Sequence, residues 1–279
     1  MLGTLYLVPT PIGNLSDFSP RAVETLNLVD FIAAEDTRVT LKLLNHFGIK
    51  KPMMAYYRHN TQAGGQAVLK RLTDGESCAL VSDAGTPAVS DPGEELVKLC
   101  VEHGITAIAL PGPCALTTAL SVSGLPTGRF TFEGFPAMNK KNRREHLTSL
   151  QGETRTMIFY EAPHKLLTTL QDFRDIFGPD RPIALCRELT KLHEEVIRTT
   201  LAGAVAHFEA QPPKGEFVLV VGGAEPIAEE SPNPDEALSQ VAALRQQGVS
   251  LKDAVRQVAD RLGLKKNSLY SMALEEEKE

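Results

Sequence analysis

The stretch Leu80-Val-Ser-Asp-Ala-Gly-Thr-Pro-Ala-Val-Ser-Asp-Pro-Gly93 indicates how this chain folds. An apolar strand over residues 77–81 ends in small residues, prolines, glycines and two aspartates, and a helix over 94–102 follows, closed by Gly104. We call residues 82–93 the anchor loop. A strand that continues through such a loop into a helix brings backbone N–H and C=O groups close to a ligand. The same pattern is also typical of a well-capped turn without a ligand.

Other predicted strands end in comparable loops. The strands over 4–8 and 106–110 lead into Pro9-Thr-Pro-Ile-Gly-Asn14 and Pro111-Gly-Pro-Cys-Ala115, and a short apolar strand precedes Glu35-Asp-Thr-Arg38. Two acids and an arginine at the carboxyl end of a strand indicate a site more than a packing device. Strands that alternate with helices predict a mostly parallel sheet covered on both faces, with these loops at its ligand-binding edge.

Composition changes along the chain suggest three parts. Ser123-Gly-Leu-Pro-Thr-Gly128 and the Pro/Glu/Ser-rich residues 225–235 are typical of linkers. We therefore expect an α/β fold of two α/β domains with a small helical, helix-turn-helix-like extension. The predicted parts are a mostly parallel domain, a mixed-sheet domain and the extension, over residues 1–122, 129–224 and 236–274.

The bulk properties favour a cytoplasmic globular protein. The chain has 279 residues, 42% of them hydrophobic and 23% charged, with a net charge of −6. No apolar run is long enough for a membrane span, and the N-terminus resembles a first strand more than a signal peptide. The four cysteines are scattered, which suits reduced thiols, and the seven histidines show no metal-ligand spacing, so we expect no metal.

Two segments carry positive charge in an otherwise acidic chain. Residues 140–145 hold four basic side chains and one acid, and Lys140, Lys141, Arg143 and Arg144 could contact RNA phosphates. A solvated helix start is the alternative. The tail also places five basic against two acidic side chains over residues 252–266. A helical cap, a dimer contact and an RNA contact all remain open there.

In chain order, eight motifs resemble those of one family: PTPIGN, AAEDTR, SDAGTPAVSDPG, PGPCA, SGLP, FYEAPH, RELTKLHEE and KGEFVLVVGG. They are similar to the small-subunit ribosomal RNA methyltransferases that methylate a cytidine 2′-hydroxyl, within the tetrapyrrole (corrin/porphyrin) methylase superfamily. The resemblance covers residues 5–223, and the tail resembles that family's helical extension. It implies S-adenosylmethionine as methyl donor in a cleft between two α/β domains, ribosomal RNA or the small subunit as partner, and a homodimer.

The resemblance also implies cofactor contacts. They are Pro11, Ile12, Gly85, Thr86, Val89, Cys114, Ala115, Tyr160 and Gly215. Thr86 stands where many relatives carry an aspartate, so the carboxylate contact of those relatives is not expected here.

The residues leave the catalytic base open. Asp83, Glu161 and Glu188 are carboxylates at predicted strand ends and form the shortlist, with Arg38 and Lys191 as charge stabilisers on the RNA side. Each could equally belong to a structural ion pair. Because methyl transfer is an in-line displacement, positioning should supply much of the acceleration.

Three other functions remain to be weighed. A tetrapyrrole methylase would share the cofactor cleft but would not need the basic helix. A nucleotide-dependent oxidoreductase is disfavoured because no G-x-G-x-x-G follows the first strand. A non-catalytic RNA-binding assembly protein would not bind S-adenosylmethionine, so cofactor binding separates it from an enzyme.

Overall fold

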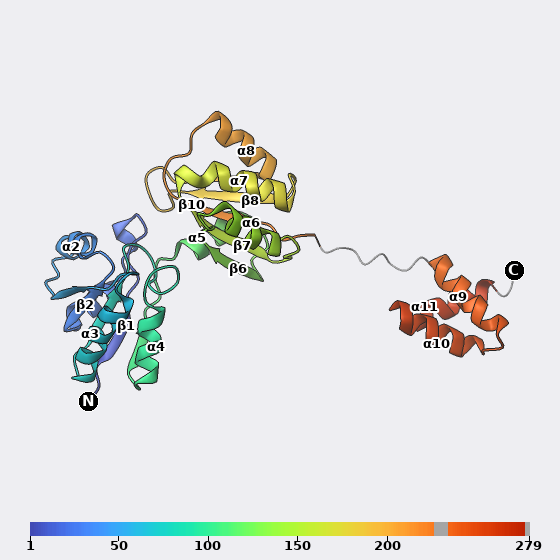
Figure 1. Ribbon diagram of the computed structural model, residues 1–279, viewed down its shortest axis with the longest axis horizontal. Helices are drawn as coiled ribbons and strands as arrows, with labels where there is room; N and C mark the ends of the chain where they lie inside the picture. Colours follow the sequence, from blue (N-terminus) through green and yellow to red (C-terminus); the bar gives the residue numbers. More distant parts are fainter. Residues whose placement is uncertain (226–233, 277–279) are drawn as a thin grey trace. The chain divides into compact units, whose positions relative to one another are not determined.

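The computed structural model describes residues 1–225 and 234–276, which fall into two units, Met1–Ala224 and Glu225–Glu279 (Figure 1). Each unit has its own core. Most of the predicted linker over 225–235 lies outside the described residues.

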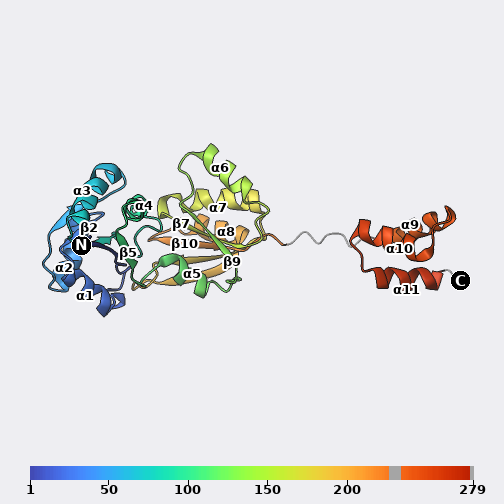
Figure 2. The same ribbon diagram turned by 90° about the horizontal axis from the view of Figure 1, so that it is seen from below.

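The first sheet of the larger unit is parallel throughout. Its strands follow the order β3-β2-β4-β1-β5 and span Thr4–Leu7 (β1), Phe31–Ala34 (β2), Met53–Ala55 (β3), Cys78–Val81 (β4) and Thr106–Ala109 (β5). The helices α1 (Pro20–Leu28) and α2 (Thr37–His46) cover one face, and α3 (Thr61–Thr73) and α4 (Glu94–Glu102) cover the other (Figure 2). The predicted parallel, doubly covered sheet is therefore confirmed.

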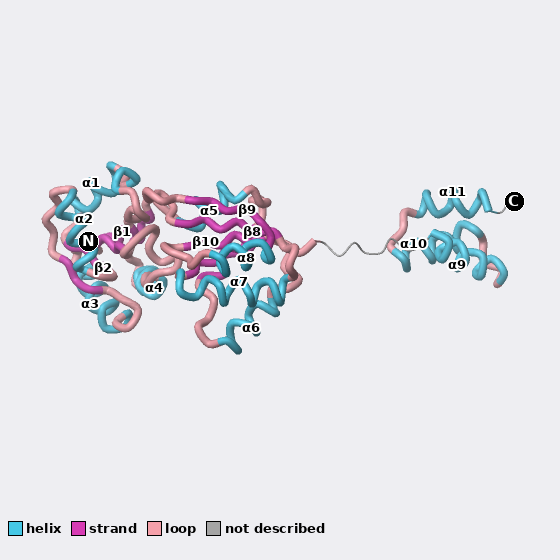
Figure 3. Tube along the Cα trace, turned by 90° about the horizontal axis from the view of Figure 1, so that it is seen from above, coloured by secondary structure: helices cyan, strands magenta, loops and turns pink. Residues whose placement is uncertain are grey.

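The second sheet is mixed, as predicted. Its order is β6-β7-β10-β8-β9, with strands Phe130–Gly134 (β6), Thr156–Glu161 (β7), Pro182–Arg187 (β8), Glu195–Thr200 (β9) and Phe217–Val221 (β10). Only the β6–β7 pair among these described strands is parallel. The helices α7 (Pro163–Phe177) and α8 (Leu201–Ala210) pack on one face, and α6 (Lys140–Ser149) packs beside α7 (Figure 3).

Helix α5 (Ala115–Ser123) follows the last strand of the first sheet but packs against the second sheet. Its buried Leu116, Ala119 and Leu120 share one core cluster with Ile158 and Val220 of the second sheet. A boundary drawn by packing would thus lie before α5, whereas the sequence places it after Val122.

Local sequence explains where several helices begin. Ser19 caps α1 by accepting from the Ala22 N–H at 3.1 Å, with Pro20 at the first helical position. Asp36 accepts from the Arg38 N–H at 2.8 Å, so α2 starts at Thr37. Helix α8 was not predicted, because its segment LAGAVAHFEA has little polar alternation to reveal a helical face.

The smaller unit is a three-helix cluster. Its helices are α9 (Pro234–Gln246), α10 (Leu251–Leu262) and α11 (Lys266–Glu276), and their core includes Val241, Val258 and Leu269. Gly263 takes the left-handed conformation with φ 66°, which ends α10. No helix in the described part of the chain is long and apolar enough to cross a bilayer.

Candidate active site

Hydrogen bonds tie three loops together at the carboxyl edge of the first sheet. Thr10, after β1, and Gly85, in the anchor loop, exchange backbone hydrogen bonds of 2.9 and 3.0 Å. The Thr86 hydroxyl donates to the Pro113 carbonyl, after β5, at 2.9 Å. The loops that follow β1, β4 and β5 thus form one platform, and Thr86 serves as a tie within it.

A cavity of about 490 Å³ lies between this platform and the second sheet. The first sheet's loops contribute one wall, and residues of β7, β8 and β10 contribute the other. Its volume falls within the range of small-molecule sites, about 300–1,000 Å³. The residues that line it are Ile12, Glu35, Asp83, Ala84, Gly85, Thr86, Val89, Ser90, Asp91, Cys114, Ala115, Phe135, Tyr160, Glu161, Ala162, Pro163, Cys186, Leu189, Lys191, Glu216, Phe217 and Val218.

Seven of the nine expected cofactor contacts line this cavity: Ile12, Gly85, Thr86, Val89, Cys114, Ala115 and Tyr160. Pro11 lies instead in the wall of a smaller cavity of about 170 Å³ beside it. Gly215 lines neither; its φ of 86° brings the position of an added Cβ within 2.5 Å of the Glu188 side chain. Gly215 therefore allows a close approach to Glu188.

Of the five carboxylates that line the cavity, three come from the loops of the first sheet: Glu35, Asp83 and Asp91. Burial raises the pKa of Glu35, and the charge of Asp91 raises it further. Burial also raises the pKa of Asp83 and of Asp91. Arg58 is the cation whose charge opposes the shifts of Glu35 and Asp91, yet within the described residues none of the three forms an ion pair. The cavity therefore has a negative wall that a cationic ligand would neutralise.

Asp83 is held by the backbone while remaining exposed. Its Oδ1 accepts from the Asp36 N–H at 3.0 Å, and its own N–H donates to Glu35 Oε2 at 3.3 Å. These bonds fix the end of β4 against the end of β2. Of the residues that the structure describes, Asp83 alone lines both cavities.

The other two shortlisted carboxylates, Glu161 and Glu188, are both engaged in hydrogen bonds within the protein. Glu161 is buried and accepts from the Ala162 N–H at 2.9 Å and from the Thr169 hydroxyl at 2.5 Å. Glu188 does not line the cavity. It accepts from the Glu216 N–H and from Lys191 Nζ, both at 2.9 Å, and the Glu216 backbone bond is the main cause of its lowered pKa. Carboxylates that are held by several hydrogen bonds of this kind are suited to positioning neighbouring segments, and less suited to accepting a proton from a substrate.

Lys191 does line the cavity, paired with Glu188 at 2.9 Å and Glu216 at 2.8 Å. Burial disfavours its charge, but the bonds to Glu216 and Glu188 outweigh burial, so the Lys191 pKa is raised. Lys191 is thus a fixed cation in the wall.

Tyr160 links the two walls. Its hydroxyl accepts from the Leu116 N–H, at the start of α5, at 3.0 Å. Phe132 and Phe135 contact its ring edge-on, with ring centroids 4.9 and 5.5 Å away. Phe135 is 59% exposed, so it offers an aromatic face at the cavity mouth.

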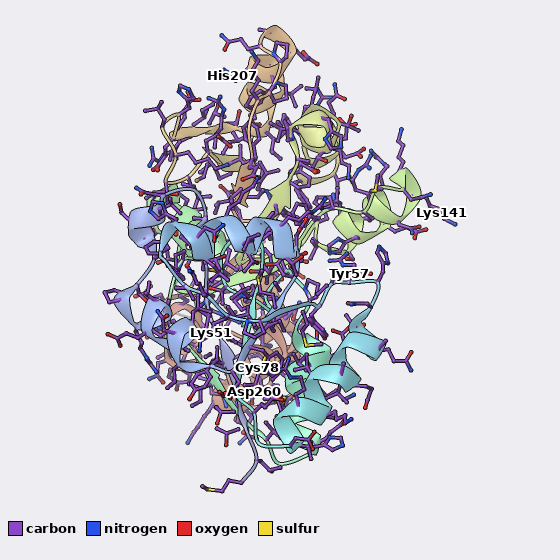
Figure 4. The ribbon with its side chains drawn as sticks, turned by 90° about the vertical axis from the view of Figure 1, so that its left-hand side faces the viewer. Lys51, Tyr57, Cys78, Lys141, His207 and Asp260 are labelled. Carbon is purple, nitrogen blue, oxygen red and sulfur yellow. The ribbon has the colours of Figure 1, made fainter. Side chains whose placement is uncertain are left out.

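The predicted RNA-binding residues are not equivalent in the structure. Lys140 is exposed, and Lys141 is 81% exposed and points away from α6 (Figure 4), with only a 3.8 Å ion pair to Glu145. Arg143 is buried and bonded to Asp172 at 2.8 Å, and Arg144 shares that carboxylate at 2.6 Å. A four-residue phosphate cluster is therefore not what α6 presents: Arg143 would have to leave its buried partner to reach RNA.

Arg38 is 87% exposed and pairs with Asp36 at 2.6 Å, outside both cavities. Among the described residues, no group of histidine, cysteine, aspartate and glutamate has the arrangement of a metal site.

Sequence reasoning missed several lining residues, and three of them can act on a ligand: Glu35, Asp91 and Phe135. Glu35 and Asp91 stood in quoted motifs, and their places at a strand end and in the anchor loop were a usable signal. Phe135 had none, because only the fold brings the β6–α6 loop beside Tyr160.

Backbone strain is concentrated beside the cavity. The non-glycine residues with positive φ in the described part are Ala88 (67°), Glu188 (51°) and Thr190 (66°). One lies in the anchor loop and two lie just after β8. Such residues cluster at functional sites, where the surrounding structure holds them in place.

The fold and the loops at its cavity define the class of protein: the chain belongs to the tetrapyrrole methylase family. The profile described as Tetrapyrrole (Corrin/Porphyrin) Methylases matches residues 4–205. A second profile, RsmI C-terminal HTH domain, matches residues 232–277.

The particular relatives are ribosomal RNA methyltransferases. The chain is 49% identical to "Ribosomal RNA small subunit methyltransferase I" of Synechocystis over 274 residues, which is 98% of each chain. It is 46% identical to the protein of that name in Escherichia coli O157:H7 over 277 residues, 99% of this chain and 96% of the other.

Solved structures share the fold at low identity. A diphthine synthase matches with a TM-score of 0.61 at 14% identity, over 79% of this chain and 90% of the other. Uroporphyrin-III C-methyltransferase from Thermus thermophilus, complexed with S-adenosylhomocysteine, matches with a TM-score of 0.55 at 17% identity, over 78% and 97%. The larger unit is thus a tetrapyrrole-methylase fold.

Proposed function

We propose that this protein is an S-adenosylmethionine-dependent methyltransferase that methylates a cytidine ribose 2′-oxygen in small-subunit ribosomal RNA. The observation that carries the proposal is the negative wall formed by Glu35, Asp83 and Asp91 in a cavity of cofactor size. Family membership supports the methyl donor, and the names of the full-length relatives support the RNA.

The cavity residues fit S-adenosylmethionine. Carboxylates with raised pKa values favour a cation, and the cofactor carries a sulfonium and an ammonium group. Ile12, Val89 and Val218 offer apolar surface for an adenine ring, and the small residues of the anchor loop allow its backbone to approach. When bound, the cofactor supplies an electrophilic methyl group next to a neutral leaving sulfur.

The chain's own residues then position the acceptor and take its proton. Transfer forms a carbon–oxygen bond as the carbon–sulfur bond breaks, and the 2′-hydroxyl loses a proton. Asp83 is the best-placed base because its carboxylate is exposed and its raised pKa brings it closer to that of a general base working near neutral pH. Glu188 and Lys191 stabilise the wall instead of taking the proton.

The partners follow from the same proposal. Ribosomal RNA or the small subunit is the substrate, the cytoplasm is the compartment, and a homodimer is the expected assembly. Lys140, Lys141 and Arg38 are the exposed cations of the larger unit that we assign to RNA phosphate.

A chemical assay tests the product. A 2′-O-methyl group blocks alkaline cleavage of the following phosphodiester. Small-subunit RNA from cells that lack this protein should gain one cleavage position, and purified protein with S-adenosylmethionine should remove it. Methylation mapped to a base atom, with cleavage unchanged, would overturn the ribose assignment. Calorimetry that detects no S-adenosylmethionine binding would overturn the enzyme itself.

A further inference from the structure

The smaller cavity has a polar floor and an aliphatic rim. Thr10, Thr40 and Ser82 are buried at its floor, each 3% exposed. Leu15, before α1, and Val39, on α2, remain 42% and 38% exposed at its edge. Two exposed aliphatic side chains from different segments, together with a polar floor, suit a flat group whose edge is polar and whose faces are not.

The size of this cavity excludes a whole cofactor. At about 170 Å³ it lies below the lower end, about 300 Å³, of typical small-molecule sites. A single ring fits this size class better than a nucleoside with its sugar. The main cavity already has room for the cofactor.

The hydrogen-bonding groups on the floor favour a ring that donates. The Thr10 hydroxyl donates to the Ser82 carbonyl at 3.2 Å, and the Ser82 hydroxyl donates to the Gly85 carbonyl at 3.3 Å. With their protons committed, these hydroxyl oxygens can still accept. An exocyclic amino group, as on cytosine, matches them, and a carbonyl at the same place, as on uracil, does not.

We infer that this smaller cavity, which we call the base slot, binds the flipped-out base of the acceptor nucleotide, with Leu15 and Val39 on its two faces. Enzymes that act on a nucleotide within RNA hold the extruded base by apolar contacts on its faces and hydrogen bonds at its edge. The inference rests on the proposed function.

Asp83 connects the base slot with the proposed reaction. It lines both cavities, so it lies between the residues that would hold the base and those that would hold the methyl donor. The ribose of a nucleotide whose base fills the slot must cross that shared wall. Its 2′-hydroxyl is then next to the carboxylate proposed to take its proton.

The first experiment narrows the slot with Val39→Phe, and Val101→Phe is the matched control. Val101 is also an exposed valine on a helix, 69% exposed on α4, and lines neither cavity. Val39→Phe should raise the KM for small ribosomal subunits from the deletion strain about tenfold, because the larger side chain occupies the space of the base and prevents its insertion. Its Kd for S-adenosylmethionine should match that of the wild type, and Val101→Phe should change neither.

Leu15→Ala provides a second variant that removes a face without adding bulk, and it should also raise the KM. A wild-type KM in both variants would overturn the base slot. So would a loss of S-adenosylmethionine affinity with an unchanged KM, because the slot would then belong to the cofactor.

The second experiment needs no catalysis. Methyl NMR of the full chain, saturated with S-adenosylhomocysteine, would follow Leu15, Val39 and Leu43 during titration with cytidine 5′-monophosphate. We expect their resonances to shift and those of Val101 to stay, with uridine 5′-monophosphate several-fold weaker. Absent shifts, or equal affinity for the two nucleotides, would overturn the assignment.

The two experiments separate the inference from the function beneath it. If wild-type protein does not methylate small-subunit RNA, the proposed function fails, whatever the titration shows. If wild-type protein methylates normally and Val39→Phe does so equally well, only the base slot fails.

Discussion

The Asp83 carboxylate is subject to opposing influences on its protonation. Its Oδ1 accepts the Asp36 N–H, which favours the charged form, whereas burial and the charge of Asp36 disfavour it. The net result is a raised pKa. A carboxylate that stays bonded to the backbone and is still exposed at a cavity can change its protonation without losing its place.

Replacing Asp83 with asparagine tests this. Asparagine keeps the Oδ1 acceptor for Asp36 but cannot take a proton, so kcat should fall about hundredfold while the protein stays folded. In the wild type, kcat should rise with pH through the raised pKa of Asp83, because only the charged form accepts the proton. That limb should disappear in Asp83→Asn.

Asp180→Asn is the control, since Asp180 is exposed and lines neither cavity. If Asp83→Asn retained wild-type kcat and the same pH limb, another group would have to be the base.

Gly85 shows why a residue's neighbours decide how it can be probed. Its φ is 85°, and an added Cβ would lie 3.3 Å from Ile12 Cγ2. A valine there would strain the backbone bridge to Thr10 as well as fill the cavity. Substitutions at Gly85 are therefore expected to affect folding and ligand binding together, whereas substitutions at Val39 and Asp83 are expected to affect function without affecting folding.

At the scale of elements, α6 divides its four cations by face. Arg143 and Arg144 turn toward Asp172 on α7, and Lys140 and Lys141 remain exposed. Breaking a buried ion pair from one side costs about 3 kcal/mol or more. The two arginines therefore attach α6 to α7, and the two lysines are left for a partner.

We expect Lys140→Ala/Lys141→Ala to weaken RNA binding and to reduce the slope of log affinity against log salt by about 1.4–1.8, the value for two phosphate contacts. Thermal stability should be unchanged. Arg143→Ala should instead lower the melting temperature. Lys70→Ala/Lys98→Ala removes two exposed lysines from α3 and α4 as a control. A slope identical to that of the wild type would leave α6 as a solvated helix face.

Elements with a strong local pattern were the ones that could be predicted. The helix Glu94–Glu102 has its predicted bounds, and the short apolar strand predicted before Glu35 is β2, because a glycine stop marks the one and an apolar run marks the other. Packing between distant segments could not be predicted. Arg143 carries the same charge in sequence as Lys141, but it is buried and paired with Asp172, which lies 29 residues away in the chain.

The residues of the candidate site could be predicted in the loops at the strand ends, but not in the apolar segments that close the cavity. Small-residue loops marked the ligand-binding edge, and the family resemblance pointed to Gly85, Thr86 and Ala115 within them, which do line the cavity. The opposite wall contributes three ordinary apolar side chains: Phe135 from the loop after β6, Leu189 from the loop after β8, and Val218 from β10. Residues of this kind become functional only through the tertiary fold.

At the scale of the whole molecule, chain order separates the cavity from the helical tail. Both cavities lie within Met1–Ala224, and the three-helix cluster lies in Glu225–Glu279. Two of the five cations over residues 252–266 are paired, Arg256 with Asp253 at 3.3 Å and Lys266 with Asp260 at 2.9 Å. Lys252 and Lys265 are exposed.

A chain truncated after Glu225 should retain S-adenosylmethionine affinity and lose RNA affinity by about tenfold in low salt, where phosphate contacts are strongest. The cut preserves the bond from the Ala224 N–H to the Glu153 carbonyl, at 2.6 Å, which secures the end of the larger unit. Sedimentation of both proteins provides the second readout. Unchanged RNA affinity with a loss of the dimer would assign the tail to assembly.

Cys114 gives the cavity a chemical label of its own. It lines the cavity and is half-buried, whereas Cys78, Cys100 and Cys186 are buried. A maleimide should therefore modify Cys114 first in the native protein, and a saturating ligand should slow that reaction by covering the thiol. Mass spectrometry of the peptide that contains Cys114 would then measure how much of the cavity is occupied by ligand. The protein needs no added tag, so the measurement would also work in a cell extract, with Cys114→Ser as the blank.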